Sequence, residues 1–192
     1  MKQIAAIILA AGSSRRFGKS NKLLAKLVDR PVLDHVLSAV GTLPLCDIKA
    51  VLSEQSDEIC DLCNKHGIGW IVNSQAHLGM GASISAGATA IDGVADGLMI
   101  TLGDMPFIKE ETHHALLTAF SNAPTGSIIA PTIDGARGHP VIFSACYLPD
   151  LKNLNGDRGA LKIINANSRL AIDVPVDDPG ILQDIDHPGD LE

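Results

Sequence analysis

The chain has 192 residues with 46% hydrophobic content and a formal net charge of -7, which suits one domain over residues 1–192 with a sizeable core. The negative charge and an aromatic content of only 3% lack the basic, base-stacking surface of a nucleic-acid-binding protein, so no nucleic-acid partner is expected. No apolar run reaches the roughly 18 to 20 residues of a membrane span, so no membrane association is expected.

The first predicted element is a strand over residues 4–10, IAAIILA, whose unbroken apolar run is typical of a buried parallel strand. The run ends in a Gly- and Arg-rich loop, which favours a strand over a signal peptide. Without a secretory signal, the four cysteines are expected to be reduced thiols, and the location is expected to be cytoplasmic. Cys60 and Cys63 form a C-x-x-C inside an amphipathic helical pattern, which favours a structural role over a redox or metal role.

Strands and helices then alternate. In chain order we predict a helix over 31–40, a strand over 48–53, a helix over 56–66, a strand over 70–73, a helix over 82–91, a central strand over 97–104, a helix over 109–121, strands over 127–131 and 140–143, a helix over 157–167 and a strand over 170–176. This alternation predicts a doubly wound α/β fold, Rossmann-like, with a mostly parallel sheet and helices on both faces. His113 and His114, on the helix over 109–121, are expected at the surface.

The loop after the first strand carries the strongest signal. Residues 9–22, LAAGSSRRFGKSNK, nearly match an ATPase phosphate loop, but five residues instead of four separate Gly12 from Gly18. A G-x-G-x-x-G dinucleotide fingerprint is also absent. Glycines allow backbone N–H groups to approach phosphate oxygens, and Arg16 and Lys22 supply positive charge. A solvated basic turn is the alternative. Because ligands bind beyond the carboxyl ends of parallel strands, this loop and the GDMP turn at 103–106 should border one cleft.

The loop resembles the L-x-x-G-x-S-x-R-x-G-x-x-K signature of the nucleotidyltransferases with a molybdopterin-transferase-like fold. The matching residues are Leu9, Gly12, Ser14, Arg16, Gly18 and Lys22. Further resemblance lies in GMGASISAG (79–87), GDMP (103–106), GARGHPVIF (135–143), GDRGA (156–160) and DIDHPGDL (184–191), the last with His187 where Thr is usual. It covers essentially the whole chain and implies a nucleotide-diphospho-sugar transferase-like fold. LAAG, instead of the LAGG of the guanylyl relative, favours the molybdenum cofactor cytidylyltransferases.

The resemblance implies that CMP passes from CTP to the terminal phosphate of Mo-molybdopterin and that pyrophosphate is released. It implies nucleotide contacts at Leu9, Ala10, Ala11, Gly12, Ser14, Arg16, Gly18, Lys22, Gly81, Ser83 and Asp104. Arg16, Lys22 and Asp104 are the expected catalytic residues, and Lys22 is expected to contact the phosphates in preference to Lys19. Acceptor contacts are expected at Arg137, His139 and Arg158. A molybdenum hydroxylase apoenzyme is a further candidate partner.

Magnesium is the expected cofactor, with Asp104 and Asp186 as its ligands, because Mg²⁺ takes hard oxygen ligands from one or two carboxylates and from phosphates. The alternatives are an Asx-turn or helix cap at Asp104 and a surface turn at Asp186. A structural turn is likewise the alternative for His139. Three other functions stay open: guanylyl transfer, nucleotidyl transfer to another sugar or alcohol phosphate, and a carrier that holds the molybdenum cofactor without chemistry.

Overall fold

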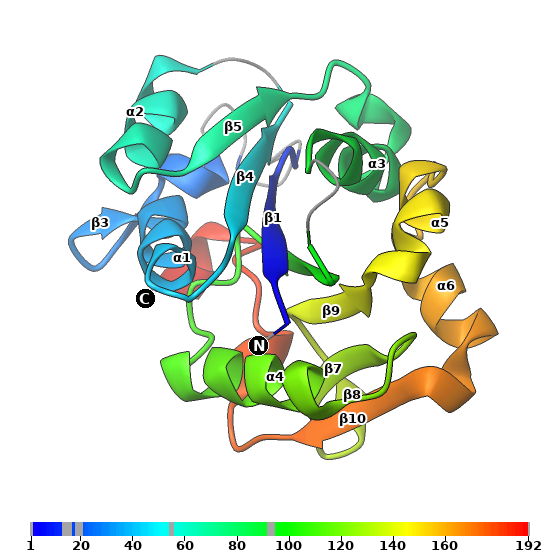
Figure 1. The fold of residues 1–192 in the computed structure, drawn as a ribbon. Helices are drawn as coiled ribbons and strands as arrows, with labels where there is room; N and C mark the ends of the chain where they lie inside the picture. Colours follow the sequence, from blue (N-terminus) through cyan, green and yellow to red (C-terminus); the bar gives the residue numbers. More distant parts are fainter. Residues whose placement is uncertain (1, 13–16, 18–20, 54–55, 92–94, 192) are drawn as a thin grey trace.

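The computed structural model describes residues 2–12, 17, 21–53, 56–91 and 95–191, which build an eight-stranded sheet with helices packed against it (Figure 1). The strand order is β10-β7-β9-β6-β1-β4-β5, and β8 pairs with β7. The strands are β1 (Ile4–Ala10), β4 (Asp47–Leu52), β5 (Gly69–Val72), β6 (Gly97–Leu102), β7 (Ile128–Ile133), β8 (Ala136–Arg137), β9 (Val141–Ser144) and β10 (Ala171–Pro175). Among the neighbours β9 runs antiparallel to β6 and β7, and β8 antiparallel to β7, while the other pairs are parallel.

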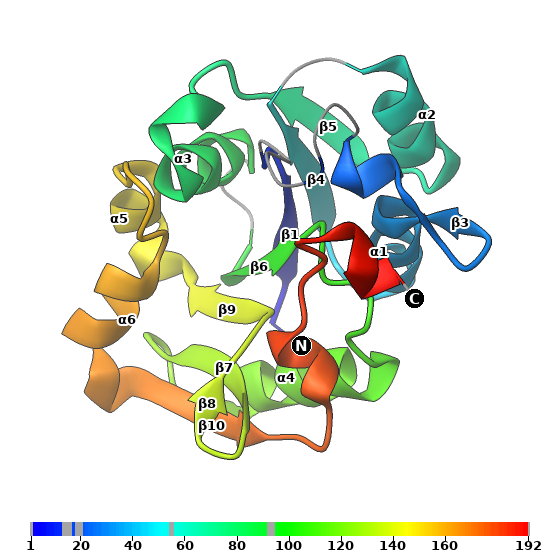
Figure 2. The same cartoon turned by 180° about the vertical axis from the view of Figure 1, so that it is seen from behind.

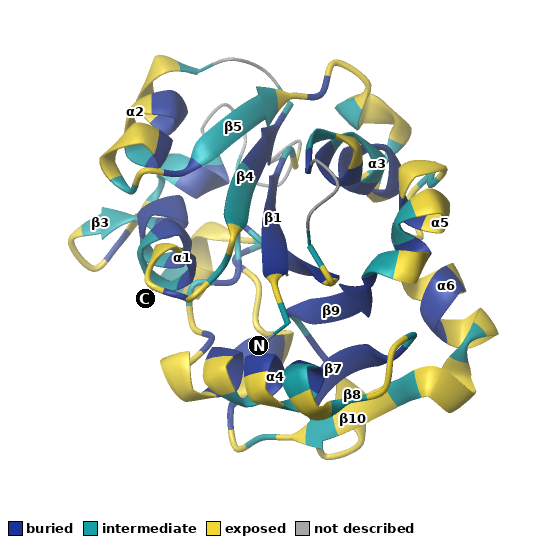
Figure 3. Cartoon of the chain, in the orientation of Figure 1, coloured by how far each residue is buried: buried dark blue, intermediate teal, exposed yellow. Residues whose placement is uncertain are grey.

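Helices cover both faces of the sheet. They are α1 (Val32–Gly41), α2 (Asp57–Lys65), α3 (Met80–Ala90), α4 (Glu110–Asn122), α5 (Leu148–Lys152) and α6 (Leu161–Ala166). Alternate residues of β1 point to opposite faces, so Ile8 packs into the core with α1, α2 and α4, whereas Ile7 packs into the core with α3, α5 and α6. Figure 3 shows β1 and β9 buried and the outward sides of the helices exposed. The predicted doubly wound, mostly parallel architecture is confirmed.

Three local features differ from the sequence prediction. Pro31 precedes the first helix instead of opening it, because it pairs in a small hairpin of β2 (Lys26–Leu27) and β3 (Arg30–Pro31). The helix predicted over 157–167 begins only at Leu161, since Gly159 has φ 52° and interrupts the helical backbone. His113 is 2% exposed, so its predicted surface position is wrong. Its ring faces the core because it shares a helix face with Leu116 and Leu117.

The segment after β10 returns to the carboxyl edge of the parallel strands. It contains two 3-10 turns, η6 (Pro179–Leu182) and η7 (Pro188–Leu191), and it passes near α1 and β6 (Figure 2). Ile181 and Ile185 are fully buried along this segment and fix its path. Asp178 and the backbone N–H of Ile185 bind it to the body of the fold. None of the helices in the described residues is long and apolar enough to cross a membrane.

Candidate active site

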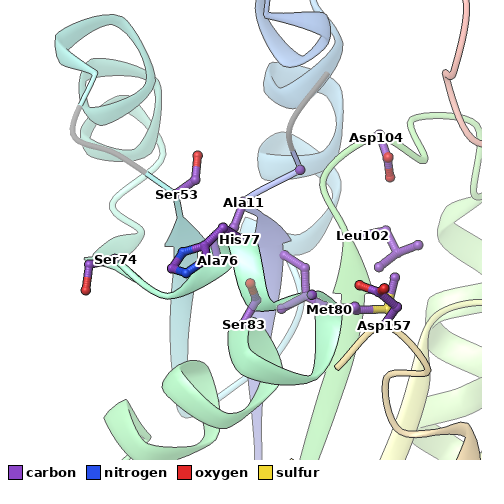
Figure 4. A pocket seen from close by; sticks show the side chains of 13 residues that line it. Ala11, Ser53, Ser74, Ala76, His77, Met80, Ser83, Leu102, Asp104 and Asp157 are labelled. Atoms are coloured by element: carbon purple, nitrogen blue, oxygen red, sulfur yellow. The ribbon is translucent and has the colours of Figure 1, made fainter. Parts of the chain in front are cut away.

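A cavity of about 650 Å³ opens where β1, β4 and β6 end, as expected for parallel strands that share one carboxyl edge. The residues that line it come from the ends of β1 and β6, from the segments after β1, β4, β5 and β6, from the start of α3 and from the segment between α5 and α6: Leu9, Ala11, Gly12, Ser53, Ser74, Ala76, His77, Gly79, Met80, Ser83, Leu102, Asp104 and Asp157. Figure 4 shows Ser53, Ser74 and His77 toward one side of this cavity and Asp104 toward the other. The cavity therefore has one side with two serines and a histidine and an opposite, acidic side.

Three carboxylates converge at the acidic side. Asp104, Asp184 and Asp186 each place one oxygen within 4.8 Å of the others. Ile185 lies between the last two and turns into the core, so its neighbours turn outward together. Its N–H donates to the backbone carbonyl of Asp104 over 2.8 Å, which fixes the C-terminal segment against the GDMP turn. Such a set of hard oxygen donors fits a divalent cation such as Mg²⁺.

A turn at the end of the DIDHPGDL segment holds Asp186 in place. The Asp190 carboxylate accepts hydrogen bonds from the backbone N–H groups of Asp186 at 2.8 Å and His187 at 2.7 Å. These hydrogen bonds, led by that from His187, lower the pKa of Asp190. Since a hydrogen bond from an amide stabilises the ionised carboxylate, Asp190 remains an acceptor at neutral pH.

Lys22 joins the acidic group from the other end of the chain. Its Nζ lies 2.6 Å from Asp104 Oδ2 and 3.1 Å from Asp186 Oδ1. Burial alone would lower the pKa of Lys22, but the hydrogen bonds and charges of the two aspartates outweigh burial and raise it. The backbone here is held by Asn21, whose side chain accepts from the N–H of the buried Leu23 at 3.0 Å. Lys22 is thus a charged side chain on a fixed backbone.

The predicted nucleotide-binding residues fall into three groups. Leu9, Ala11, Gly12, Ser83 and Asp104 line the cavity, and Lys22 contacts Asp104. Ala10 lies in the core, and Gly81 packs against the 155–156 backbone, its N–H donating to the carbonyl of residue 156 at 2.8 Å; neither is among the cavity residues. Ser14, Arg16, Gly18 and Lys19 lie outside the described residues.

Arg137, His139 and Arg158, the predicted acceptor residues, line a second cavity of about 240 Å³ whose other lining is mostly apolar. Met80 borders both cavities. The guanidinium of Arg137 is already bound by Asp173 of β10, at 2.5 and 3.2 Å. His139 carries a buried Nδ1 that has no hydrogen-bond partner among the described residues. Burial lowers the pKa of His139, although its backbone contact with Ile100 and the charge of Asp104 act in the opposite direction.

Several residues of the site were not predicted from the sequence. Asp184 precedes Asp186 in the D-x-D of the closing segment, and this pattern could have identified it. Asp157 lies within GDRGA, the segment in which only Arg158 was expected to contact a substrate. Ser53, Ser74 and His77 carry no motif, and only the fold brings them to the cavity.

Residues 6–171 match the model of the MobA-like NTP transferase domain. Among curated proteins, the chain is 29% identical to the purine catabolism protein PucB of Bacillus subtilis over 97% of this chain and 93% of that protein. It is 24% identical to the nicotine blue oxidoreductase of Paenarthrobacter nicotinovorans over 95% of this chain and 92% of that protein.

Solved structures with this fold include the Rv0371c homologue from Mycobacterium sp. strain JC1. It has a TM-score of 0.83 and 28% identity, with 97% of this chain and 92% of that chain covered. Rv0371c of Mycobacterium tuberculosis H37Rv, solved as a complex with manganese, has a TM-score of 0.75 and 21% identity, with 91% and 88% covered. The family model spans most of the chain and the fold agrees with it. The chain therefore belongs to the MobA-like NTP transferase domain family, a nucleotidyltransferase family.

Proposed function

We propose that this chain transfers CMP from CTP to the terminal phosphate of Mo-molybdopterin, releasing pyrophosphate, with Mg²⁺ as its cofactor. The observation that carries the proposal is a junction: the Asp104, Asp184 and Asp186 cluster lies at the acidic side of a nucleotide-sized cavity, and a second cavity, lined among others by Arg137, His139 and Arg158, adjoins it across Met80. A triphosphate and an anionic acceptor can meet at such a junction. The manganese bound by Rv0371c supports a divalent cation in this fold.

In the proposed reaction, a phosphate oxygen of the acceptor forms a bond to the α-phosphorus of CTP, and the bond from that phosphorus to the bridging oxygen of pyrophosphate breaks. The attacking oxygen is already anionic, so no general base is needed and catalysis consists of positioning and charge stabilisation. The backbone at Gly12, together with Arg16 and Lys22, would hold the pyrophosphate end. Asp104, Asp184 and Asp186 would hold Mg²⁺, which when bound neutralises and orients phosphate oxygens.

The acceptor would occupy the second cavity. Its mostly apolar lining suits a pterin ring system, and Arg158 and His139 are among the lining residues that would contact the anionic groups. Because Arg137 is paired with Asp173, it would need to exchange that partner before it bound the acceptor. Delivery of the product to a molybdenum hydroxylase apoenzyme in the cytoplasm would complete this function.

CTP is proposed over GTP because Ala11 lines the cavity at a position where the guanylyl relative has Gly. A methyl group there leaves less room for a purine, and a small steric difference of this kind provides about 1 to 3 kcal/mol of discrimination. One relative is named as an oxidoreductase, but this chain lacks the G-x-G-x-x-G fingerprint of dinucleotide binding. Nucleotidyl transfer is therefore the better-supported class.

The test is pyrophosphate release with each of the four NTPs, with and without Mo-molybdopterin, at millimolar Mg²⁺. The proposal predicts release with CTP that depends on the acceptor, and little release with GTP. Release with GTP at equal or greater efficiency would reassign the nucleotide, and acceptor binding without release from any NTP would favour the carrier.

A further inference from the structure

Lys22 takes the place between two carboxylates that a divalent cation would need. Its ammonium group contacts Asp104 Oδ2 and Asp186 Oδ1, two of the oxygens available for a cation. The side chain is only 11% exposed, so the contact is part of the packed site. We propose, on the basis of the function proposed above, that Lys22 is an internal competitor of the cation, and that it leaves the aspartates when cation and triphosphate enter together.

The competition follows from the distances. A Mg²⁺ ion binds carboxylate oxygens at roughly 2.1 Å, and the ammonium lies at 2.6 and 3.1 Å from the same two side chains. A cation that bridged these oxygens would be within a few ångströms of another positive charge, and the two would repel strongly in a partly buried site. A cation that binds both Asp104 and Asp186 therefore excludes the ion pairs of these two aspartates with Lys22, and the ion pairs exclude the cation.

Asp184 offers the entry point for the cation. Within the part of the chain that the structure describes, no ion pair of Asp184 is found, and its side chain is exposed. Its oxygen nevertheless lies within 4.8 Å of those of the other two aspartates. A cation can bind Asp184 first and then take over the oxygens that Lys22 releases.

A bound triphosphate would offer the displaced ammonium a second partner. Lys22 follows the loop after β1, which is the proposed binding site of the triphosphate. Its backbone is held by the Asn21 cap and by the buried Leu23, so only the flexible four-carbon side chain has to turn. The same motion would free the cation ligands and bring a positive charge to the phosphates. Binding of CTP and of the cation would then be positively coupled, in both directions.

The experiment measures Mn²⁺ binding to the nucleotide-free protein by electron paramagnetic resonance, so that no turnover is needed. Lys22→Met and Lys22→Gln remove the competitor, Lys22→Arg keeps a charge that can pair with both aspartates, and Lys26→Met removes an exposed charge four residues away as the matched control. The two neutral variants should bind Mn²⁺ about tenfold more tightly or better than wild type, the size of a charge-assisted contact. Lys26→Met should stay within about threefold, since exposed charges are screened.

Unchanged or weaker Mn²⁺ binding in both folded neutral variants would overturn the inference, as would equal tightening in Lys26→Met. Adding Asp104→Asn to Lys22→Met must remove the tightened site; tight binding that survives would place the cation elsewhere and would also overturn it. Pyrophosphate release by wild type separates this inference from the proposed function. Turnover without tightening in Lys22→Met refutes only the competition, whereas tightening without turnover from any NTP refutes only the cytidylyl transfer.

Discussion

Removal of the buried Asp178 carboxylate is expected to destabilise the fold strongly, although Asp178 lines neither cavity. It is 1% exposed. Its Oδ2 accepts from the Lys109 N–H at 2.9 Å and from the Thr112 hydroxyl at 2.6 Å, and its Oδ1 accepts from the Gly180 N–H at 3.0 Å. Asp178→Ala would leave these donors without an acceptor, and each buried unsatisfied group costs about 1 to 3 kcal/mol.

Water can reach the exposed Lys109, and the Thr112 hydroxyl can rotate, so we expect a loss of about 3 to 5 kcal/mol in the free energy of unfolding. This is a large part of the roughly 5 to 15 kcal/mol that stabilises a typical domain. Urea unfolding at neutral pH measures it. Asp177→Ala is the control, because this exposed residue contributes its backbone carbonyl, which accepts from Lys109 Nζ at 2.8 Å and is kept in the variant; the expected change is within about 0.5 kcal/mol.

The same substitution should weaken the cation site under conditions where the variant is folded. Asp178 ties the start of the C-terminal segment to α4, and that segment carries Asp184 and Asp186 to Asp104. We expect Mn²⁺ affinity to fall in Asp178→Ala and to remain in Asp177→Ala. A loss of stability below about 1 kcal/mol, or a destabilised variant with wild-type Mn²⁺ affinity, would refute the view that this segment positions the metal ligands.

Three further predictions test the site, the packing and the titration. Asp104→Asn should abolish pyrophosphate release while CTP still binds, and Asp186→Asn should be impaired less completely; near-normal release by the first variant would leave GDMP as a structural turn. Gly87→Ala should lower the free energy of unfolding by about 1 to 3 kcal/mol, because its added Cβ would lie 2.9 Å from side chains of β1 and β4. Gly41→Ala is the control, since its Cβ would meet only ordinary contacts at 3.6 Å and beyond. Equal effects of the two substitutions would contradict this packing. Burial lowers the pKa of His113 in the folded state. The free energy of unfolding is therefore unaffected by this histidine above about pH 6.5 and falls as the pH drops below that value, because the unfolded chain then binds a proton more readily. Urea unfolding at two pH values should show a smaller loss in His113→Gln than in wild type.

Much of the architecture could be predicted from the sequence because its signals are local. The apolar run at 4–10 has no polar face, so it had to be a strand buried on both sides, and β1 is one. The GDMP turn follows another such strand, β6, so both loops end at one edge. The parallel pairing of β1 with β4 and β6 then brings Asp104 beside the first loop without further information.

Long-range contacts account for what the sequence could not predict. Nothing near Lys22 in the chain indicates that its ammonium binds Asp186, 164 positions away. The D-x-D pattern hints at Asp184, but only the fold shows that Ile185 is buried and that both neighbouring carboxylates lie near that of Asp104. The pairing of Arg137 with Asp173 depends on β8 and β10 lying on either side of β7, an order that no local pattern encodes.

The central claim is tested most directly by the product itself. Purified protein is incubated with CTP, Mo-molybdopterin and Mg²⁺, and the mixture is examined by mass spectrometry for molybdopterin cytosine dinucleotide, with pyrophosphate measured in parallel. The account predicts one equivalent of dinucleotide for each pyrophosphate released, and neither product when Mg²⁺ is removed by chelation or when Asp104 is replaced by Asn. Absence of the dinucleotide with intact CTP, or its formation at an unchanged rate without a divalent cation, would contradict the account.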